Sequence, residues 1–262
     1  MILAIDIGNT NIVIGCCEND KILFIERLST NQTATVLEYA VSLKNVLELN
    51  NIESNQIDGS IISSVVPSVT GVVDEAIKKI INKKSLIVGP GIKTGLSIVI
   101  DNPAQLGSDL VVDAVAGLAN YSLPLAIIDM GTATTVTVVD SSRNCIGGLI
   151  LPGLRVSLDS LIGRTSQLPK IGLEHPKNVI GRNTIDCMKS GIIYGTAGNI
   201  DGVIDRIEEE LGEKVTAVAT GGLAELIIPY CKRNIILDNE LLLKGLMTVS
   251  YTHLTLPTTP YV

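Results

Sequence analysis

The feature that most constrains this chain is a strand-turn-strand pattern that occurs twice. Residues 1–15 read MILAIDIGNTNIVIG, an apolar strand that ends in Asp6, a glycine and short polar residues before a second apolar strand begins. Residues 125–139 read LAIIDMGTATTVTVV, so Asp129 takes the place of Asp6, 123 positions later. An internal repeat of this kind predicts a duplicated fold in which two such loops face each other.

Each copy of the pattern has the chemistry of a phosphate-binding loop. Gly8 lets the backbone approach an anionic ligand, and Asn9 and Thr10 offer short hydrogen-bond donors. Asp6 can hold the divalent cation that accompanies a polyphosphate. A third glycine turn, Thr220–Gly222, follows a later strand, and the three turns would converge on one nucleotide if the two halves face each other. One such loop alone is more simply an ordinary tight turn, but the repeat and the third turn together favour a nucleotide site.

Other phosphate-binding motifs have no direct support in this sequence. Neither a G-x-x-x-x-G-K-[ST] loop nor a well-placed G-x-G-x-x-G occurs, which argues against P-loop and dinucleotide enzymes. The net charge of -7 disfavours binding to nucleic acid or to an anionic membrane, yet permits a local site for a small anion. With only His175 and His253, a histidine-rich metal site or a Ser-His-Asp triad has little to work with.

Length and cysteine usage bound the class of protein. A chain of 262 residues with 46% hydrophobic residues suits two domains, each with its own core. Five cysteines, an odd number, stand at spacings that match no zinc motif, so we expect reduced thiols. The chain opens directly on a strand pattern, and no apolar run approaches the roughly 18 residues of a membrane span. We therefore expect a cytoplasmic protein without a membrane partner.

Hydrophobic periodicity predicts an α/β protein whose second half repeats the first. In the first half the predicted elements are strands at 2–7, 11–16 and 21–28, a helix at 34–49, a strand at 57–65, a helix at 69–82, strands at 85–88 and 96–100, and a helix from about 105. In the second half they are strands at 125–130, 134–140 and 144–150, a helix at 154–162, an irregular connector at 165–179, a helix at 184–211, a strand at 215–219, and helices at 223–231 and 239–249.

The order of elements predicts two domains, at residues 1–122 and 123–249. Residues 250–262 break the helical rhythm with four threonines and two prolines. We interpret this tail as an assembly scar and leave it out of the fold prediction. Whether it belongs to the native chain stays open.

Several acidic side chains are candidates for chemistry. An acid that ends a core strand is costly unless a cation or donors meet it, which favours function for Asp6 and Asp129. Asp109, in a first helical turn after a glycine, is a reasonable proton acceptor, although the helix dipole favours an acid there as well. Asp186 and the acids at 208–210 are interpreted as exposed helix charges without a functional role.

The three glycine turns, DIGNT, DMGTATT and TGG, resemble those of the acetate and sugar kinase, heat-shock-70 and actin superfamily, and more closely those of the type III pantothenate kinases. The resemblance extends in order over residues 1 to about 249. Its further segments are Ser63–Pro67, Asp101–Pro103, Gly107–Asp109, Gly147–Gly153, Leu168–Pro169, Ile180–Thr184 and Ser190–Gly195.

The resemblance implies two ribonuclease-H-like (actin-like ATPase) domains with an interdomain cleft, and ATP-dependent phosphorylation of pantothenate to 4'-phosphopantothenate, the entry to coenzyme A synthesis. It implies Mg²⁺ held with ATP by Asp6, a monovalent cation, K⁺ or NH₄⁺, held by Asp129, and proton acceptance by Asp109. It also implies a homodimer, and a helix rich in Ile, Leu and Val such as 184–205 is a candidate two-fold contact. The implied ATP-binding residues are Asp6, Ile7, Gly8, Asn9, Thr10, Asn11, Ile12, Val13 and Thr132. Those implied to face pantothenate are Gly107, Ser108, Asp109, Leu110 and Thr184, although Thr184 is equally interpretable as a helix cap.

Two positions depart from the family pattern on the pantothenate side. The family usually reads Gly-Ala-Asp-Arg around the catalytic acid, whereas residues 107–110 read Gly-Ser-Asp-Leu, so a guanidinium is missing at Leu110. The family also tends to carry tyrosine where Ile100 stands. Two alternatives therefore stay open: a nucleotide-binding regulator that has lost turnover, and a kinase of another small alcohol.

Overall fold

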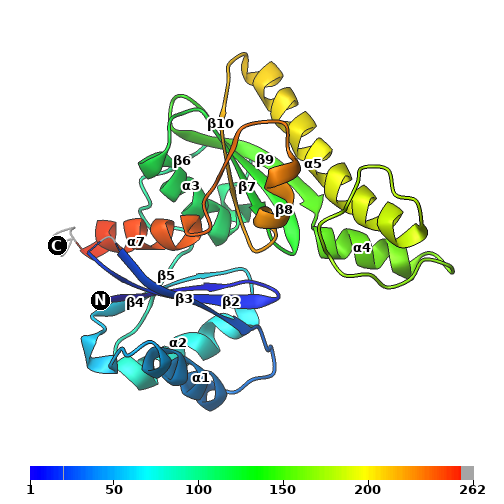
Figure 1. Ribbon diagram of the computed structural model, residues 1–262. Coiled ribbons are helices and arrows are strands. Elements are labelled where there is room, and N and C mark those ends of the chain that lie inside the picture. The colour runs from blue at the N-terminus through cyan, green and yellow to red at the C-terminus, as the bar shows by residue number, and fades with distance from the viewer. Residues whose placement is uncertain (20, 255–262) are drawn as a thin grey trace. The chain divides into compact units, whose positions relative to one another are not determined.

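Both copies of the repeated pattern form the centre of a β-sheet in the computed structural model, which describes residues 1–19 and 21–254 (Figure 1). The chain divides into two units. Unit 1 contains residues 1–96, 101–116 and the segment from 241 onward, and unit 2 contains residues 97–100 and 117–240.

The first sheet has the strand order β3-β2-β1-β4-β5. Strand β1 (Ile2–Ile7) pairs antiparallel with β2 (Asn11–Glu18), which pairs antiparallel with β3 (Lys21–Ser29). On its other side β1 pairs parallel with β4 (Gly59–Ser64), which pairs with β5 (Leu86–Ile87).

The second sheet repeats this topology. Its antiparallel strands are β7 (Leu125–Met130), β8 (Ala133–Val139) and β9 (Asn144–Pro152), and its parallel strands are β10 (Thr216–Thr220) and β11 (Ile235–Leu237). The order β11-β10-β7-β8-β9 mirrors the first sheet, and the short strand β6 (Ser97–Ile98) adds to β9. The predicted duplicated α/β fold is therefore confirmed.

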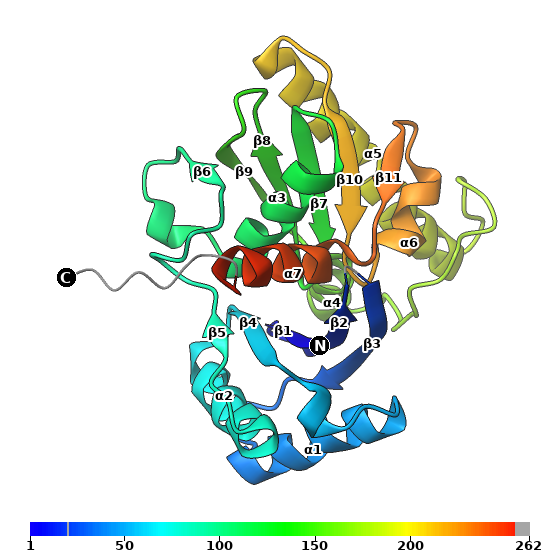
Figure 2. The ribbon, with the colours of Figure 1, turned by 90° about the vertical axis from the view of Figure 1, so that its left-hand side faces the viewer.

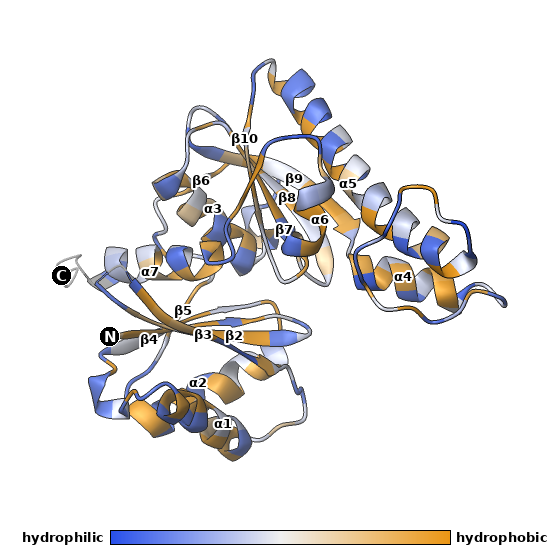
Figure 3. Cartoon of the chain, viewed as in Figure 1, coloured by the Kyte–Doolittle hydropathy of each residue, from blue (hydrophilic) through white to orange (hydrophobic). Residues whose placement is uncertain are grey.

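Helices cover both faces of the first sheet. Helices α1 (Val36–Leu49) and α2 (Pro67–Ile81) bury apolar residues against the face that carries Leu3, Ile5 and Ile7. A capping box between Thr35 and Glu38 starts α1. Figure 3 shows hydrophobic and hydrophilic residues alternating along both helices, as expected when one side rests on a sheet.

The opposite face of the first sheet carries Ile2, Ala4 and Ile61 and packs against the first part of α3 (Ser108–Asn120) and against α7 (Leu241–Leu254). Figure 2 shows α3 and α7 side by side. At Gly245 a side chain would collide with the carbonyl oxygen of Val112, so glycine permits this close approach of the two helices.

In unit 2 the long helix α5 (Thr184–Leu211) packs with α4 (Leu154–Gly163) and α6 (Ala224–Ile227) over the face of the second sheet that carries Ala126 and Ile128. Asn183 caps the start of α5, and Gly212, in the left-handed region, ends it. Short 3₁₀ turns lie at Ser54–Gln56, Pro103–Gln105 and Ile228–Tyr230. Within residues 1–19 and 21–254, every helix is too short or too polar to cross a membrane.

The structure differs from the predicted elements at three places near the C-terminus. Strand β11 was not predicted, and the helix predicted at 223–231 is α6 followed by a 3₁₀ turn. Helix α7 reaches Leu254, so it includes residues 250–254 of the segment set aside as a scar. The remainder of that segment, residues 255–262, lies outside the described residues.

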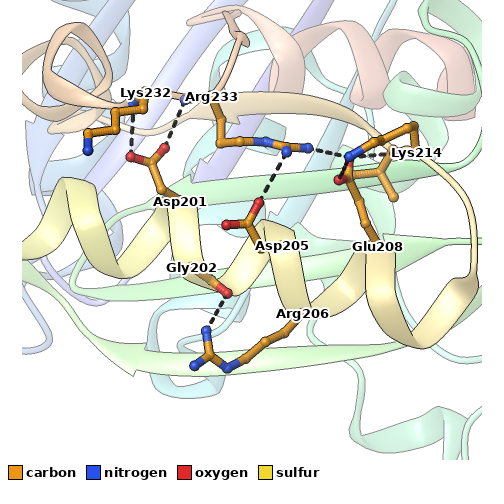
Figure 4. A network of polar contacts seen from close by, with 9 residues as sticks. Asp201, Gly202, Asp205, Arg206, Glu208, Lys214, Lys232 and Arg233 are labelled. Atoms are coloured by element: carbon orange, nitrogen blue, oxygen red, sulfur yellow. Dashed lines mark hydrogen bonds and ion pairs between the residues drawn. The ribbon is translucent and has the colours of Figure 1, made fainter.

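Glu208 is the clearest correction to the sequence interpretation, which placed it among exposed helix charges. Its side chain is only 7% exposed and forms ion pairs with Lys214, at 2.6 Å, and with Arg233 (Figure 4). Arg233 also pairs with Asp205 at 3.1 Å, and its backbone N–H donates to Asp201. This network binds the segment just before β11, which contains Arg233, to helix α5.

Opposing effects set the pKa of Glu208. Burial acts to raise the pKa of Glu208, but Lys214, the amide of Val215 and Arg233 outweigh burial and lower the pKa of this carboxyl.

Candidate active site

The hairpin between β1 and β2 presents its polar tip at the carboxyl end of β1. The N–H of Gly8 donates to the carbonyl of Asn11 at 3.0 Å, which closes the turn. The hydroxyl of Thr30 donates to the carbonyl of Gly8 at 2.6 Å, and the N–H of Thr30 donates to the carbonyl of Thr10 at 3.0 Å. Asn9, Thr10 and Asn11 are exposed, so the turn is held from behind while its polar groups face outward.

Asp6 and Ser63 occupy corresponding places at the carboxyl ends of β1 and β4. The two residues are in register in this parallel pair. Since side chains alternate along a strand, they project from the same face as Ala4 and Ile61, the face that α3 and α7 cover. The hydroxyls of Ser63 and Ser108 lie 3.0 Å apart, and Ser108 is the first residue of α3. Asp6 and the start of α3 therefore belong to one neighbourhood within unit 1.

Asp109 is the second residue of α3, and its carboxylate folds back over the start of the helix. Its Oδ1 accepts from the N–H of Leu110 at 2.9 Å. A side chain at position 107 would collide with this same oxygen, so Gly107 makes room for the carboxylate. Burial raises the pKa of Asp109, against backbone hydrogen bonds that act to lower it. The pKa of a proton acceptor is thereby moved toward neutral pH, which suits general-base chemistry.

In unit 2 the loop after β7 is packed tightly between two glycine turns. Gly221 has a φ of +93°, and an added Cβ would lie 2.6 Å from the N of Met130 and would also collide with Asp129 Oδ1. Gly153 approaches from the other turn, where a Cβ would lie 2.7 Å from the carbonyl oxygen of Gly131. The N–H of Leu223 donates to the carbonyl of Met130 at 3.3 Å. Two of the three predicted glycine turns, at 129–135 and 220–222, thus meet within this unit.

The surroundings of Asp129 fit a hard cation. Asp129 is in register with Thr135 on β8 and with Thr220 on β10, so hydroxyl oxygens flank the carboxylate. The Thr135 hydroxyl is buried and has no hydrogen-bond partner among residues 1–19 and 21–254. An orphaned oxygen beside a carboxylate at a strand end matches the oxygen donors that hard cations prefer. In the same ranges there is no cluster of three or more His, Cys, Asp or Glu side chains that would hold a metal by itself.

The remaining predicted residues occupy turns and helix starts. Thr132 is exposed in the turn between β7 and β8. Thr184 is the exposed first residue of α5, and the cap of that helix is Asn183, whose side chain accepts from the N–H of Asp186 at 2.9 Å. The interpretation of Thr184 as the helix cap is therefore wrong. Leu110 is partly buried in the first turn of α3.

The supporting contacts were not predicted from the sequence. The link from Ser63 and Ser64 to Ser108 joins residues about 45 positions apart. Both segments belong to family motifs named above. That shared membership was the one sequence signal that they lie in the same site. Gly153 and Gly131 likewise belong to two of the named motifs, but nothing in the sequence indicated that their turns touch.

Comparisons with known proteins find relatives that match most of the chain. The family described as type III pantothenate kinase matches residues 2–206. A type III pantothenate kinase of Exiguobacterium sp. (strain AT1b) is 43% identical over 249 residues, which cover 95% of this chain and 98% of the relative. The enzyme of the same name from Bacillus cytotoxicus is 41% identical over 246 residues, 94% of each chain.

Among solved structures, the activator of 2-hydroxyisocaproyl-CoA dehydratase from Clostridium difficile, solved with bound ADPNP, matches with a TM-score of 0.56 at 12% identity over 99% of both chains. At this identity the likeness concerns the fold alone. It agrees with the duplicated α/β fold described above.

Proposed function

Because this chain belongs to the type III pantothenate kinase family, we propose that it transfers the γ-phosphoryl group of ATP to the primary hydroxyl of pantothenate. The products are 4'-phosphopantothenate and ADP, which makes this the first step of coenzyme A synthesis. The observation that carries the proposal is the Asp109 carboxylate, held at the start of α3 in the same neighbourhood as Asp6.

The reaction needs a proton acceptor, neutralised phosphate charge and an oriented hydroxyl. The hydroxyl oxygen of pantothenate forms a bond to the γ-phosphorus while the bond from that phosphorus to the β,γ-bridging oxygen breaks, and ADP leaves with the electron pair. The proton of the hydroxyl goes to the carboxylate of Asp109, whose raised pKa favours accepting it. Asp6 would hold Mg²⁺ together with ATP, and this ion would neutralise part of the phosphate charge.

The family pattern suggests further roles for the residues of this chain that match it. The hairpin from Asp6 to Val13 binds the phosphates of ATP, supported by its outward-facing polar tip. Thr132 contacts ATP, and Asp129 holds K⁺ or NH₄⁺, supported by the buried hydroxyl of Thr135. Residues 107–110 and Thr184 face pantothenate. Use of ATP also implies a cytoplasmic location for the enzyme.

We also propose that the protein acts as a homodimer. The predicted contact along α5 needs revision, because Ile193, Ile200 and Ile204 are buried in the core of unit 2. Exposed apolar side chains lie instead at the start of the helix: Ile180 is 81% exposed, and Ile185 is 45% exposed. Apolar side chains this open to water are candidates for a two-fold contact.

The deciding experiment incubates the purified protein with ATP, Mg²⁺ and K⁺ in the presence of pantothenate and scores the mass of the product. Asp109→Asn is expected to abolish product formation, since the proton acceptor is lost. Glu38→Gln is the matched control, because Glu38 is likewise an acid in a first helical turn. Equal effects of the two substitutions would reduce Asp109 to a residue that only complements the helix dipole.

The same assay separates the two alternatives. ATP binding without any phosphorylated product would indicate a nucleotide-binding regulator. Release of ADP with a competing small alcohol, but not with pantothenate, would indicate a kinase of another acceptor.

A further inference from the structure

We propose that Ser108 is a positioning residue, whose hydroxyl locks the first turn of α3 to the end of β4 and so fixes Asp109 for proton transfer. The inference rests on the proposed function for the role of Asp109. The lock itself is defined by three side chains and their neighbouring backbone: Ser63, Ser64 and Ser108.

The hydroxyl of Ser108 uses its full hydrogen-bonding capacity. Its Oγ lies 3.0 Å from the Oγ of Ser63, accepts from the N–H of Ser64 at 3.0 Å, and donates to the carbonyl of Ser64 at 3.0 Å. A hydroxyl has one donor and two acceptor sites. With Ser63 as the donor in the first contact, all three sites are filled, so the position of Ser108 relative to β4 is defined from three directions.

The end of β4 is itself well anchored, so it is a firm support for α3. Ser63 is fully buried. The Ser64 hydroxyl accepts from the N–H of Val66 at 3.1 Å and from the hydroxyl of Thr70 at 2.7 Å, which ties it to the start of α2. A chain of hydroxyl contacts therefore connects α2, β4 and α3.

The first turn of α3 has little apolar packing of its own to hold it. Residues 106–110 are only partly buried, whereas residues 111–117 are buried. The three hydrogen bonds of Ser108 act directly before Asp109, at the point where packing is weakest. Removing them is expected to widen the range of positions of the carboxylate without unfolding the helix.

Catalysis is sensitive to such widening, since a misplacement of about 1 Å can cost roughly 100-fold in rate. We therefore expect Ser108→Ala to lower kcat by about tenfold while the KM for ATP changes by less than about twofold. Ser108→Thr retains the hydroxyl and is expected to recover most of kcat. Ser63→Ala removes one of the three bonds, and its expected loss is about threefold.

Ser60→Ala is the matched control. Ser60 is also buried on β4, and its hydroxyl pairs with that of Ser85 at 2.9 Å, at the opposite end of the strand from α3. The Ser60→Ala variant loses a hydroxyl contact of the same kind, at a position remote from Asp109. Equal falls of kcat in Ser60→Ala and Ser108→Ala, or an unchanged kcat in Ser108→Ala, would overturn the proposal. If Ser108→Ala does not fold, kcat is compared between Ser63→Ala and Ser60→Ala. Equal values of kcat in these two variants would then overturn the proposal.

Amide hydrogen exchange on the same variants gives a readout independent of turnover. Ser108→Ala is expected to speed exchange at residues 109–112, and Ser60→Ala is not. If the unmodified protein fails to phosphorylate pantothenate, the proposed function is lost, and exchange alone decides whether Ser108 locks the turn. Unchanged exchange at the start of α3 would reject the lock whatever the enzyme phosphorylates.

Discussion

Asp109 meets two opposing demands, because the burial that suits it for accepting a proton also makes its charge costly. The pKa of Asp109 is raised above its usual value of 3.8 by desolvation. Between the unfolded and the folded pKa, the folded state holds a proton that the unfolded state releases, so stability falls as pH rises through that window. The charge therefore destabilises the native enzyme at neutral pH.

Asp109→Asn is expected to abolish activity and yet raise the melting temperature at pH 7. The amide oxygen can still accept from the N–H of Leu110, while the buried charge is gone. The gain should shrink as pH falls below the folded pKa, where the native carboxyl becomes protonated, and should vanish below the unfolded pKa. Thermal unfolding across pH measures this, and a less stable variant at pH 7 would contradict it.

Leu110→Arg tests whether the missing guanidinium limits turnover. A charged hydrogen bond contributes about 1.5–3 kcal/mol, so kcat/KM for pantothenate should rise by about tenfold or more. Ala104→Arg adds the same charge at an exposed position just before α3 and is expected to change little. Equal rates for the native and Leu110→Arg enzymes would show that this site has adapted to leucine.

At the scale of elements, the turn after β10 matters because it supports the Asp129 loop. Gly221→Ala is expected to cost more than about 2 kcal/mol, since a positive φ adds about 1 kcal/mol and the Cβ would also press on the backbone of Met130. Gly212→Ala is the matched control, with a φ of +71° and open space around the Cβ. Denaturant unfolding should show a larger loss of unfolding free energy for Gly221→Ala than for Gly212→Ala. Equal losses would mean that the backbone at Met130 shifts to accommodate the added Cβ.

The ion pairs at Glu208 form the second element-scale link, between α5 and the approach to β11. Glu208→Gln is expected to lower the free energy of unfolding by about 2 kcal/mol, because the partly buried Arg233 guanidinium loses its buried carboxylate partner, whereas Lys214 is 82% exposed and loses little. Asp205→Asn, at a carboxylate that is 54% exposed, should cost under about 1 kcal/mol.

The Glu208 contribution also depends on pH. The pKa of Glu208 is lowered on folding, so its contribution is present above the unfolded pKa of about 4.5 and is lost as pH falls through the folded pKa. The stability difference between the native protein and Glu208→Gln should therefore shrink in acid. A difference that stays constant between neutral and acidic pH would contradict the ion-pair assignment.

At the scale of the whole molecule, the proposed homodimer requires that the exposed apolar residues at the start of α5 form the contact between the two copies. Ile180→Lys places a charge where apolar contact is proposed and should shift the protein from dimer to monomer. Light scattering after gel filtration measures the mass directly. Glu209→Lys changes an exposed site on the far part of α5 and should leave the mass unaltered.

Patterns within one element were predictable, and contacts between distant segments were not. The bounds of α5, residues 184–211, could be predicted because Asn183 and Gly212 mark its ends. The three-residue strand β11 is too short for a period to show. Glu208 looked exposed because its partners, Lys214 and Arg233, lie beyond the helix, and no pattern inside α5 reveals them.

The candidate site divides in the same way. Asp6, Asp109 and Asp129 stand out as acids at strand ends or helix starts, whereas the support that Ser63 gives to Ser108 depends on β4 and α3 meeting in space. Family resemblance placed both serines in motifs without indicating their contact.

The packing of α7 against β1 and β4 has a consequence for synthesis on the ribosome. Helix α7 is translated after residue 240, so strands β1 and β4 emerge from the ribosome long before the helix that covers them. Residues 117–240 can complete their own core first, while the N-terminal sheet waits half-covered and exposed to chaperones or to aggregation. Nascent chains arrested before residue 241 should therefore bind chaperones through their first strands.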